Sequence, residues 1–194
     1  MKTEITRADL LPMAVYENER AARRKKMAAL KANRRVEVGP FATFYFENYE
    51  TMLHQIHEML AIEKGGDAQV EDELAAYNPL VPKGRDLVAT VMFEIEDPAR
   101  RARELARLGG VEDQIFMRVA GQRSQGRQIG DEERTRADGK TSSVHFLRLI
   151  FTPEQIASFK TPGAEVTIEF AHPNYGHMAR LPEAVRAALA ADFA

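Results

Sequence analysis

Cysteine is absent from all 194 residues of this sequence. The chain therefore cannot form disulfides, use a thiolate as a nucleophile, or hold a zinc finger or an iron–sulfur cluster through its own thiolates. Because a chain without cysteine is compatible with oxidising and reducing compartments alike, this absence does not decide where the protein works.

Long apolar runs are also missing. The longest uncharged apolar segments, residues 40–46 and 87–93, have seven residues each, whereas a membrane-spanning helix needs about 20. The first residues, Met1-Lys2-Thr3-Glu4, are not followed by the apolar stretch of a signal peptide. We therefore expect a cytoplasmic protein without a membrane segment.

The chain has no large excess of charge of either sign. Its formal net charge of −2 argues against a protein that coats nucleic acid, since such proteins usually contain a strongly basic domain. The glycine-rich phosphate-binding patterns of Rossmann and Walker loops are missing too. With 44% hydrophobic and 29% charged residues, the composition predicts one ordinary globular domain over residues 1–194.

Periodicity and turn residues predict the secondary structure. We expect strands at 35–38, 41–47, 87–95, 115–120, 144–151 and 166–172, and helices at 13–34, 49–64, 67–77, 98–108, from 153 onward and at 182–193. Residues 121–139 are polar and are predicted to form a hairpin arm or a mobile loop. Because several strands are consecutive, the fold class is predicted to be α+β: a mostly antiparallel sheet with helices packed on one face, including an N-terminal helix and an α-hairpin.

The strand at 144–151 is apolar on both faces and starts with a polar cluster, Ser142, Ser143 and His145. Ser143 and His145 point to the same face, about 7 Å apart, which is too far for direct proton transfer. The G-x-S-x-G nucleophile elbow is also missing. These residues are therefore better candidates for lining a ligand or partner pocket than for acyl transfer.

Two further groups of residues suggest metal binding. On the helix at 49–64, Glu50, His54 and His57 are spaced to lie near one another, with Glu58 adjacent. The H-x-x-H-E order is not that of zincins, and a solvated helix face is the favoured interpretation. His172 and His177 flank a proline turn, where the favoured role is holding a loop by side-chain-to-backbone hydrogen bonds.

A run of cations marks the first long helix: Arg20, Arg23, Arg24, Lys25, Lys26, Lys31, Arg34 and Arg35. No aromatic residues are interleaved with these cations, and the chain as a whole is acidic. A solvated helix face or a docking surface for an acidic partner is favoured over phosphate recognition.

Several blocks taken together resemble a bacterial and archaeal family known as domain-of-unknown-function family 3501. They cover nearly the full chain: Val38-Gly39-Pro40, Phe46-Glu47-Asn48, Gln55-Ile56-His57-Glu58-Met59-Leu60, Glu73-Leu74-Ala75-Ala76-Tyr77-Asn78-Pro79-Leu80, Leu105-Ala106-Arg107-Leu108-Gly109-Gly110, Lys140-Thr141-Ser142-Ser143-Val144-His145-Phe146 and His172-Pro173-Asn174-Tyr175. His54 lies outside these blocks, and the family usually has another residue at the position of His57, which weakens the helix metal site.

The resemblance implies a redox setting, because members tend to be encoded beside rubrerythrin-like and iron–sulfur oxidoreductase proteins. It favours nine candidate ligand-binding residues: Glu47, Asn48, Glu58, Tyr77, Asn78, Ser142, Ser143, His145 and His172. We expect an accessory protein that binds a small ligand or a protein partner of an oxidoreductase system. The alternative is a metal-dependent enzyme that uses His145 or His172 with a carboxylate such as Glu47 or Glu58. No cofactor is identified, and homo-oligomerisation is left open.

One spatial prediction follows for the site. Asn78 leaves the helical hairpin just before the strand at 87–95. We expect this strand and the strand at 144–151 to be adjacent or near the centre of the sheet. If the Asn78 amide is buried, it needs hydrogen-bond partners, and the polar cluster around His145 is the natural source. We therefore predict that Asn78 and His145 border one pocket.

Overall fold

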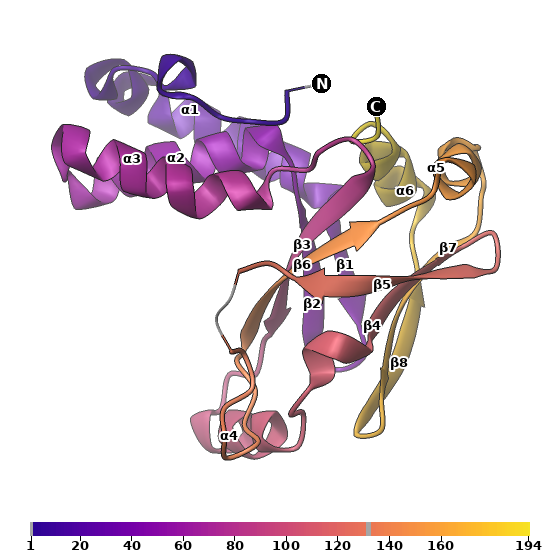
Figure 1. Cartoon of the computed structure of the whole chain (residues 1–194). Coiled ribbons are helices and arrows are strands. Elements are labelled where there is room, and N and C mark those ends of the chain that lie inside the picture. Colours follow the sequence, from indigo (N-terminus) through magenta and orange to yellow (C-terminus); the bar gives the residue numbers. More distant parts are fainter. Residues whose placement is uncertain (1, 131–132) are drawn as a thin grey trace.

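The computed structural model describes residues 2–130 and 133–194. Its strands form one antiparallel sheet in the order β1-β2-β3-β6-β5-β4-β7-β8 (Figure 1), which confirms the α+β class. The strands are β1 Arg35–Val38, β2 Ala42–Glu47, β3 Asp86–Phe93, β4 Ile115–Val119, β5 Gln122–Gln128, β6 Val144–Ile150, β7 Val166–His172 and β8 Tyr175–Arg180. The helices are α1 Met13–Ala32, α2 Tyr49–Glu63, α3 Gly66–Tyr77, α4 Pro98–Ala106, α5 Pro153–Lys160 and α6 Glu183–Ala190.

The sheet is rolled, so that its two outermost hairpins meet. The Tyr175 hydroxyl on β8 donates to the carbonyl of Val38 at 2.7 Å and accepts from the amide of Ala42 at 3.0 Å. Gly39 makes this approach feasible, because a Cβ at this position would lie 2.6 Å from Cγ of His177, and its φ of +72° suits glycine. The first and last hairpins are thereby joined without a β-ladder between them.

The main core fills the inside of the rolled sheet. Alternate residues of β2, β3, β4, β6 and β7 point inward, including Phe44, Val91, Met117, Leu147 and Ile168, all fully buried. At one end, α5 and α6 close the roll through an aromatic cluster of Phe151, Phe159 and Phe193. At the other end, Leu105, Leu108 and Val111 on and after α4 complete the core.

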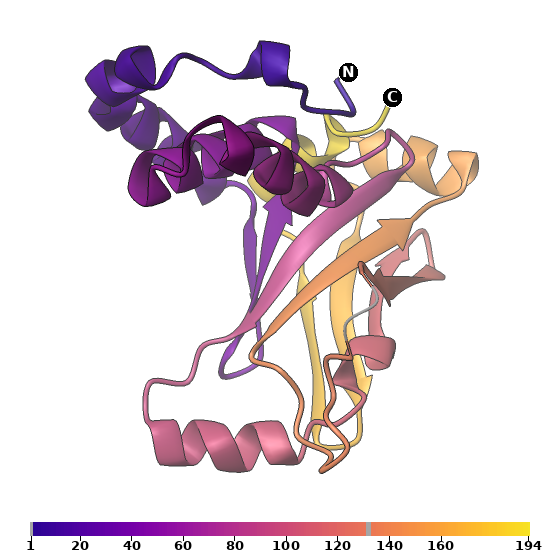
Figure 2. The same cartoon turned by 60° about the vertical axis from the view of Figure 1, so that its left-hand side comes forward.

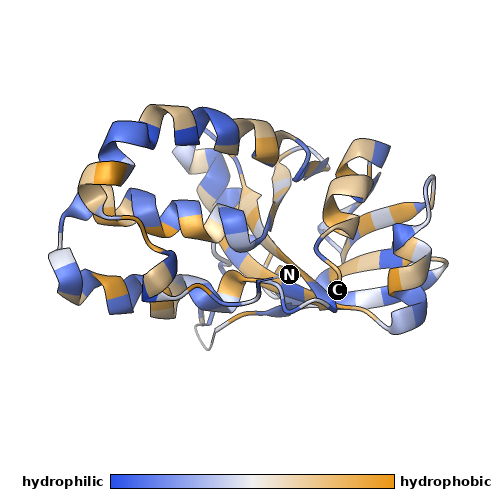
Figure 3. Cartoon of the chain, turned by 90° about the horizontal axis from the view of Figure 1, so that it is seen from above, coloured by the Kyte–Doolittle hydropathy of each residue, from blue (hydrophilic) through white to orange (hydrophobic). Residues whose placement is uncertain are grey.

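The N-terminal helices form a separate layer on the outer face of β3 (Figures 1 and 2). A second apolar cluster joins them to the sheet through Val88, which faces away from the main core. Its other buried members are Ile5, Met52, Ile56, Leu60, Val70, Leu74, Leu80 and Val81. Viewed from above, this helical layer and the α5–α6 pair stand on opposite sides, with the two termini close together between them (Figure 3).

Most element boundaries agree with the sequence prediction within a few residues, and local capping explains several of them. Asp97 accepts from the amide of Arg100 at 2.6 Å, and Thr152 caps α5. Two strands were not predicted: β5, within the segment expected to be a hairpin arm or loop, and β8. In the part of the chain that the structure describes, no helix is both long and apolar enough to cross a bilayer.

Candidate functional site

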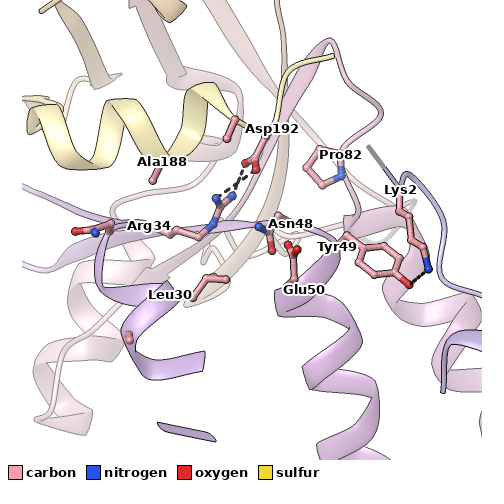
Figure 4. A pocket seen from close by; sticks show the side chains of 12 residues that line it. Lys2, Leu30, Arg34, Asn48, Tyr49, Glu50, Pro82, Ala188 and Asp192 are labelled. Carbon is pink, nitrogen blue, oxygen red and sulfur yellow. Dashed lines mark hydrogen bonds and ion pairs between the residues drawn. The ribbon is translucent and has the colours of Figure 1, made fainter. Parts of the chain in front are cut away.

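A pocket of about 590 Å³ opens where α1 ends, α2 begins and α6 ends (Figure 4). Segments far apart in the sequence form its wall. The rolled sheet brings β2 and the turn after α6 together, and Arg34 bonds to both. Its lining combines apolar surface with a few polar groups: Lys2, Ala29, Leu30, Asn33, Arg34, Asn48, Tyr49, Glu50, Pro82, Ala188, Ala191 and Asp192. A mostly apolar concavity with a few convergent polar groups is the usual form of a small-molecule site.

Arg34 is the central polar residue of the pocket. It follows α1 directly and is only 4% exposed. Its Nε donates to the carbonyl of Phe46 at 2.9 Å, and its Nη2 donates to that of Glu47 at 3.1 Å. The remaining face of the guanidinium forms a two-point ion pair with Asp192, in which Nη1 lies 3.3 Å from Oδ1 and Nη2 bonds Oδ2. These contacts fix the planar guanidinium in one orientation.

Asp192 follows α6 and is 6% exposed. Burial raises the pKa of its carboxyl and outweighs the opposing effect of the Arg34 guanidinium, while the charge of Glu50 raises the pKa further. A buried ion pair contributes little to stability compared with apolar residues of similar volume. A buried charge pair with a perturbed carboxyl, placed at the wall of a pocket, is therefore a candidate for function.

The start of α2 forms the opposite wall. Asn48 caps the helix, since its Oδ1 accepts from the amide of Thr51 at 2.9 Å, and this leaves its NH₂ group near the pocket. Glu50 is exposed in the first turn. Beyond it, the Lys2 Nζ lies 3.4 Å from the Tyr49 hydroxyl (Figure 4), and it also lies 2.5 Å from Asp9. The pocket thus offers fixed donors and acceptors beside the apolar surfaces of Leu30, Pro82 and α6.

The structure places one of the nine candidate ligand-binding residues, Asn48, at this pocket. Glu47 does not line it: its carbonyl accepts from Arg34 at 3.1 Å, and its carboxylate accepts from the hydroxyls of Thr51 at 2.7 Å and Thr90 at 2.8 Å. Glu50, predicted as a metal ligand, also lines the pocket.

The histidines of α2 do not lie on a solvated face, so that interpretation was wrong for His57. Its ring is 2% exposed, because α1 covers this side of α2. Nδ1 donates to the Leu53 carbonyl at 2.8 Å and Nε2 accepts from the Leu11 amide at 3.0 Å, so both nitrogens of a neutral imidazole are satisfied. Burial lowers the pKa of His57.

Glu58 belongs to the same contact between α1 and α2. Its carboxylate accepts from the Tyr16 hydroxyl at 2.7 Å and takes a two-point bond from Arg20, 2.9 Å at each oxygen. The Arg20 guanidinium is the main reason that the pKa of Glu58 is lowered to about 2. His54 Nδ1 lies 3.3 Å from the Tyr16 hydroxyl. Among the described residues, no three His, Cys, Asp or Glu side chains are grouped so that they could hold a metal ion.

His145 forms a buried polar cluster of its own. The ring is fully buried against the edge of Phe93, and Nε2 lies 2.9 Å from the Ser142 carbonyl and 3.3 Å from the Thr141 hydroxyl. Thr141 in turn donates to Glu112 at 3.3 Å. Ser142 contacts His145 through its carbonyl only, because its hydroxyl accepts a hydrogen bond from the Val144 amide. The carboxylates of Glu47 and Glu58 bond other partners, so neither of these two examples pairs with His145.

His172 holds a turn, as its favoured interpretation proposed. Its Nε2 lies 3.2 Å from the Gly109 carbonyl, and its Nδ1 accepts from the Asn174 amide at 3.2 Å. The candidate Ser143 forms a main-chain contact: its carbonyl accepts a hydrogen bond from the Phe93 amide.

Asn78 and His145 do not share a pocket, and that prediction was wrong. The Asn78 amide bonds the main chain of Ile5 on the outer face of the sheet, whereas His145 points into the inner core. Asp86 lies at the end of β3 near Asn78, and Val91 on the same strand pairs with His145. These two positions are five residues apart along β3, which is about 17 Å. Tyr77 packs with Asn78 on the outer side, against the second apolar cluster.

Sequence reasoning missed the main features of the pocket. Arg34 was grouped with the cations of the first long helix, and Asp192 was treated as part of the last helix. One local signal was available: Asp192 stands among apolar residues, Ala191 and Phe193, where a carboxylate needs a partner if it is buried.

Comparison with known proteins places the whole chain in a family. No curated protein matches the chain. A crystal structure from Burkholderia pseudomallei, described as a novel protein of unknown function, is 39% identical with a TM-score of 0.90 and covers 98% of this chain and 99% of its own. The family model described as "Protein of unknown function (DUF3501)" matches residues 4–193. The chain therefore belongs to the DUF3501 family.

Proposed function

We propose that this protein is an accessory binding protein whose pocket between α1, α2 and α6 holds a small organic molecule. The observation that carries the proposal is the Arg34–Asp192 pair, which is buried and fixed in orientation beside a cavity of about 590 Å³. Ligand pockets commonly have volumes of about 300–1,000 Å³ and use a few fixed polar groups for orientation. A ligand with an apolar body and a polar end matches this lining.

Ligand-observed NMR with a fragment mixture of aromatic amines, carboxylates and neutral alcohols tests the proposal. Ala188 lines the pocket, whereas the neighbouring Ala187 on the same helix is exposed and does not. We expect fragments that bind the natural chain to bind the Ala187→Trp variant equally and the Ala188→Trp variant at least tenfold more weakly. Equal binding to both variants, or no binding fragment, would contradict the proposal.

A second candidate function is docking to an acidic protein partner, for which the family resemblance suggests an oxidoreductase. Within the described residues, four cations along α1, namely Arg24, Lys25, Lys26 and Lys31, form no ion pair. A line of uncompensated charge favours association with a surface of opposite charge. Of the 20 residues of α1, Tyr16 alone is fully buried, so most of the helix surface is available.

A pull-down from the native host tests the docking surface. We expect the natural chain to recover an iron-containing oxidoreductase, and the double variant Lys25→Glu/Lys26→Glu to recover much less of it. Recovery of no such oxidoreductase above background, or equal recovery by both chains, would count against this second function.

A further inference from the structure

The N-terminal segment, residues 2–11, forms a strap that lies over the helical layer and ends at the pocket (Figure 2). Apart from a short 3₁₀ turn at Arg7–Asp9, it contains no helix or strand. Its first described residue, Lys2, contributes to the pocket wall and contacts Tyr49 across the pocket rim (Figure 4).

One side chain holds the middle of the strap at two points. The Asn78 amide accepts from the Ile5 N–H at 2.7 Å and donates to the Ile5 carbonyl at 2.8 Å. This pairing satisfies the main chain of Ile5 as a neighbouring strand would. The Ile5 side chain, 1% exposed, enters the second apolar cluster beside Met52 and Val88.

Two other side chains hold the flanks of the strap. His57 Nε2 accepts from the Leu11 amide at 3.0 Å at one flank. Lys83 Nζ donates to the Thr3 carbonyl at the other, next to the pocket residue Pro82. In addition, the exposed Arg7 side chain of the strap contacts Asp67 and Glu71 on α3. All these attachments come from side chains, and Ile5 is the one fully buried residue of the strap. A segment held in this way opens at a lower free energy than the strands of the core.

We propose that the strap is the gate of the pocket: its release from Asn78 withdraws Lys2 from the pocket wall and widens the entrance for the ligand. This inference rests on the proposed function of the pocket and specifies how access to it is controlled. Asn78, Ile5 and Lys83 act by positioning the strap, and none of them lines the pocket.

Thiol labelling measures the opening of the strap without any ligand. Because the chain lacks cysteine, an Ile5→Cys variant carries a single thiol, and a Val91→Cys variant places one in the main core as the matched control. We expect the Ile5→Cys thiol to react with a maleimide much faster than the Val91→Cys thiol. Adding Asn78→Ala should raise the rate at position 5 roughly 10- to 100-fold, because two hydrogen bonds are lost, and position 5 should remain much faster than position 91.

Hydrogen exchange of the Ile5 amide in the natural chain and in the Asn78→Ala variant provides the same comparison without a cysteine. Equal rates at position 5 with and without Asn78, or labelling at positions 5 and 91 with one common rate, would overturn the proposal. The first result would mean that Asn78 does not hold the strap, and the second that the strap opens only when the whole protein unfolds.

The kinetics of dye binding test the coupling between the strap and the pocket. The probe is 8-anilinonaphthalene-1-sulfonate, mixed by stopped flow with the natural chain, Asn78→Ala and Ala188→Trp. We expect Asn78→Ala to raise the association rate several-fold and Ala188→Trp to abolish that phase. Faster labelling without faster dye association would overturn the gate and leave the proposed function intact. Dye binding that is indifferent to Ala188→Trp would contradict the proposed function, and the gate with it.

Discussion

The rings of Tyr16 and His57 stack with their centroids 4.6 Å apart and their planes 10° from parallel. Tyr16 is the one fully buried residue of α1, and its hydroxyl donates to Glu58 on α2. The attachment of α1 to the rest of the molecule therefore depends strongly on this residue. Since α1 also supplies one wall of the pocket, its attachment affects the site.

We predict that Tyr16→Phe lowers the free energy of unfolding by about 1–2 kcal/mol, because a buried hydrogen bond to a charged group is lost. Tyr45→Phe is the matched control: the Tyr45 hydroxyl donates to Glu94 at 2.7 Å in an exposed position, and its loss should cost less than about 0.5 kcal/mol. Urea unfolding measures both. Equal losses for the two variants would show that the Tyr16 contact does not hold α1.

His57 should make the stability depend on pH. Burial lowers its pKa below the ordinary value of 6.5, so the unfolded chain binds a proton at a higher pH than the folded chain. Stability from this group is therefore fully present above about pH 6.5 and is lost as the pH falls below that value. Protonated Nε2 would also face the Leu11 N–H instead of accepting from it.

Urea unfolding between pH 7.5 and 5.5 measures this dependence. We expect the natural chain to lose stability over this interval and His57→Gln, which does not titrate, to lose less. His54 and His145 also have lowered pKa values because of burial, so part of the loss should remain in the variant. Identical slopes for both chains would exclude a titrating His57.

Removing one member of the Arg34–Asp192 pair should lower the free energy of unfolding strongly, whereas replacing both members with apolar residues should lower it little. Arg34→Met leaves a buried carboxylate without its partner, for which we predict a loss of about 3–5 kcal/mol. The double variant Arg34→Met/Asp192→Leu should recover most of that loss and should lose ligand binding at the pocket. Thermal and urea unfolding of the single and double variants form the comparison. Additive losses in the double variant would contradict the account of a buried pair retained for function.

Gly39 tests the closure of the rolled sheet. Gly39→Ala should destabilise the protein by more than Gly66→Ala, although both residues have a positive φ, +72° and +67°. At Gly66 nothing lies within 4 Å of the added Cβ, so only the backbone term of about 1–2 kcal/mol applies. At Gly39 the Cβ also meets His177 and Tyr175. Equal unfolding free energies for both variants would argue against a tight contact between the two hairpins.

Local signals account for the parts of the fold that the sequence predicts well. The Asp97-Pro98 and Thr152-Pro153 pairs start helices where the structure has them, because a cap and a proline act within one turn. The strands β5 and β8 were missed because much of each is exposed and polar. Each pairs with the strand just before it in the chain, β5 with β4 and β8 with β7, so the missing signal was apolar alternation and not proximity in the sequence.

The pocket could not be predicted by the same means. Arg34 and Asp192 are 158 residues apart, and no local pattern connects them. The burial of His57 likewise depends on α1 packing over a helix face that is polar in the sequence. The strap attachment of Asn78 joins it to Ile5, 73 residues away, which explains why its partner was sought at His145.

Mass spectrometry of small molecules released from the untagged protein, purified from its own host, shows whether the pocket carries a ligand. We predict that a small organic molecule accompanies the natural chain and Ala187→Trp in a fixed ratio, and that it is lost from Ala188→Trp. Its presence in equal amounts on all three chains, or its absence from the natural chain, would contradict a ligand-binding pocket between α1, α2 and α6.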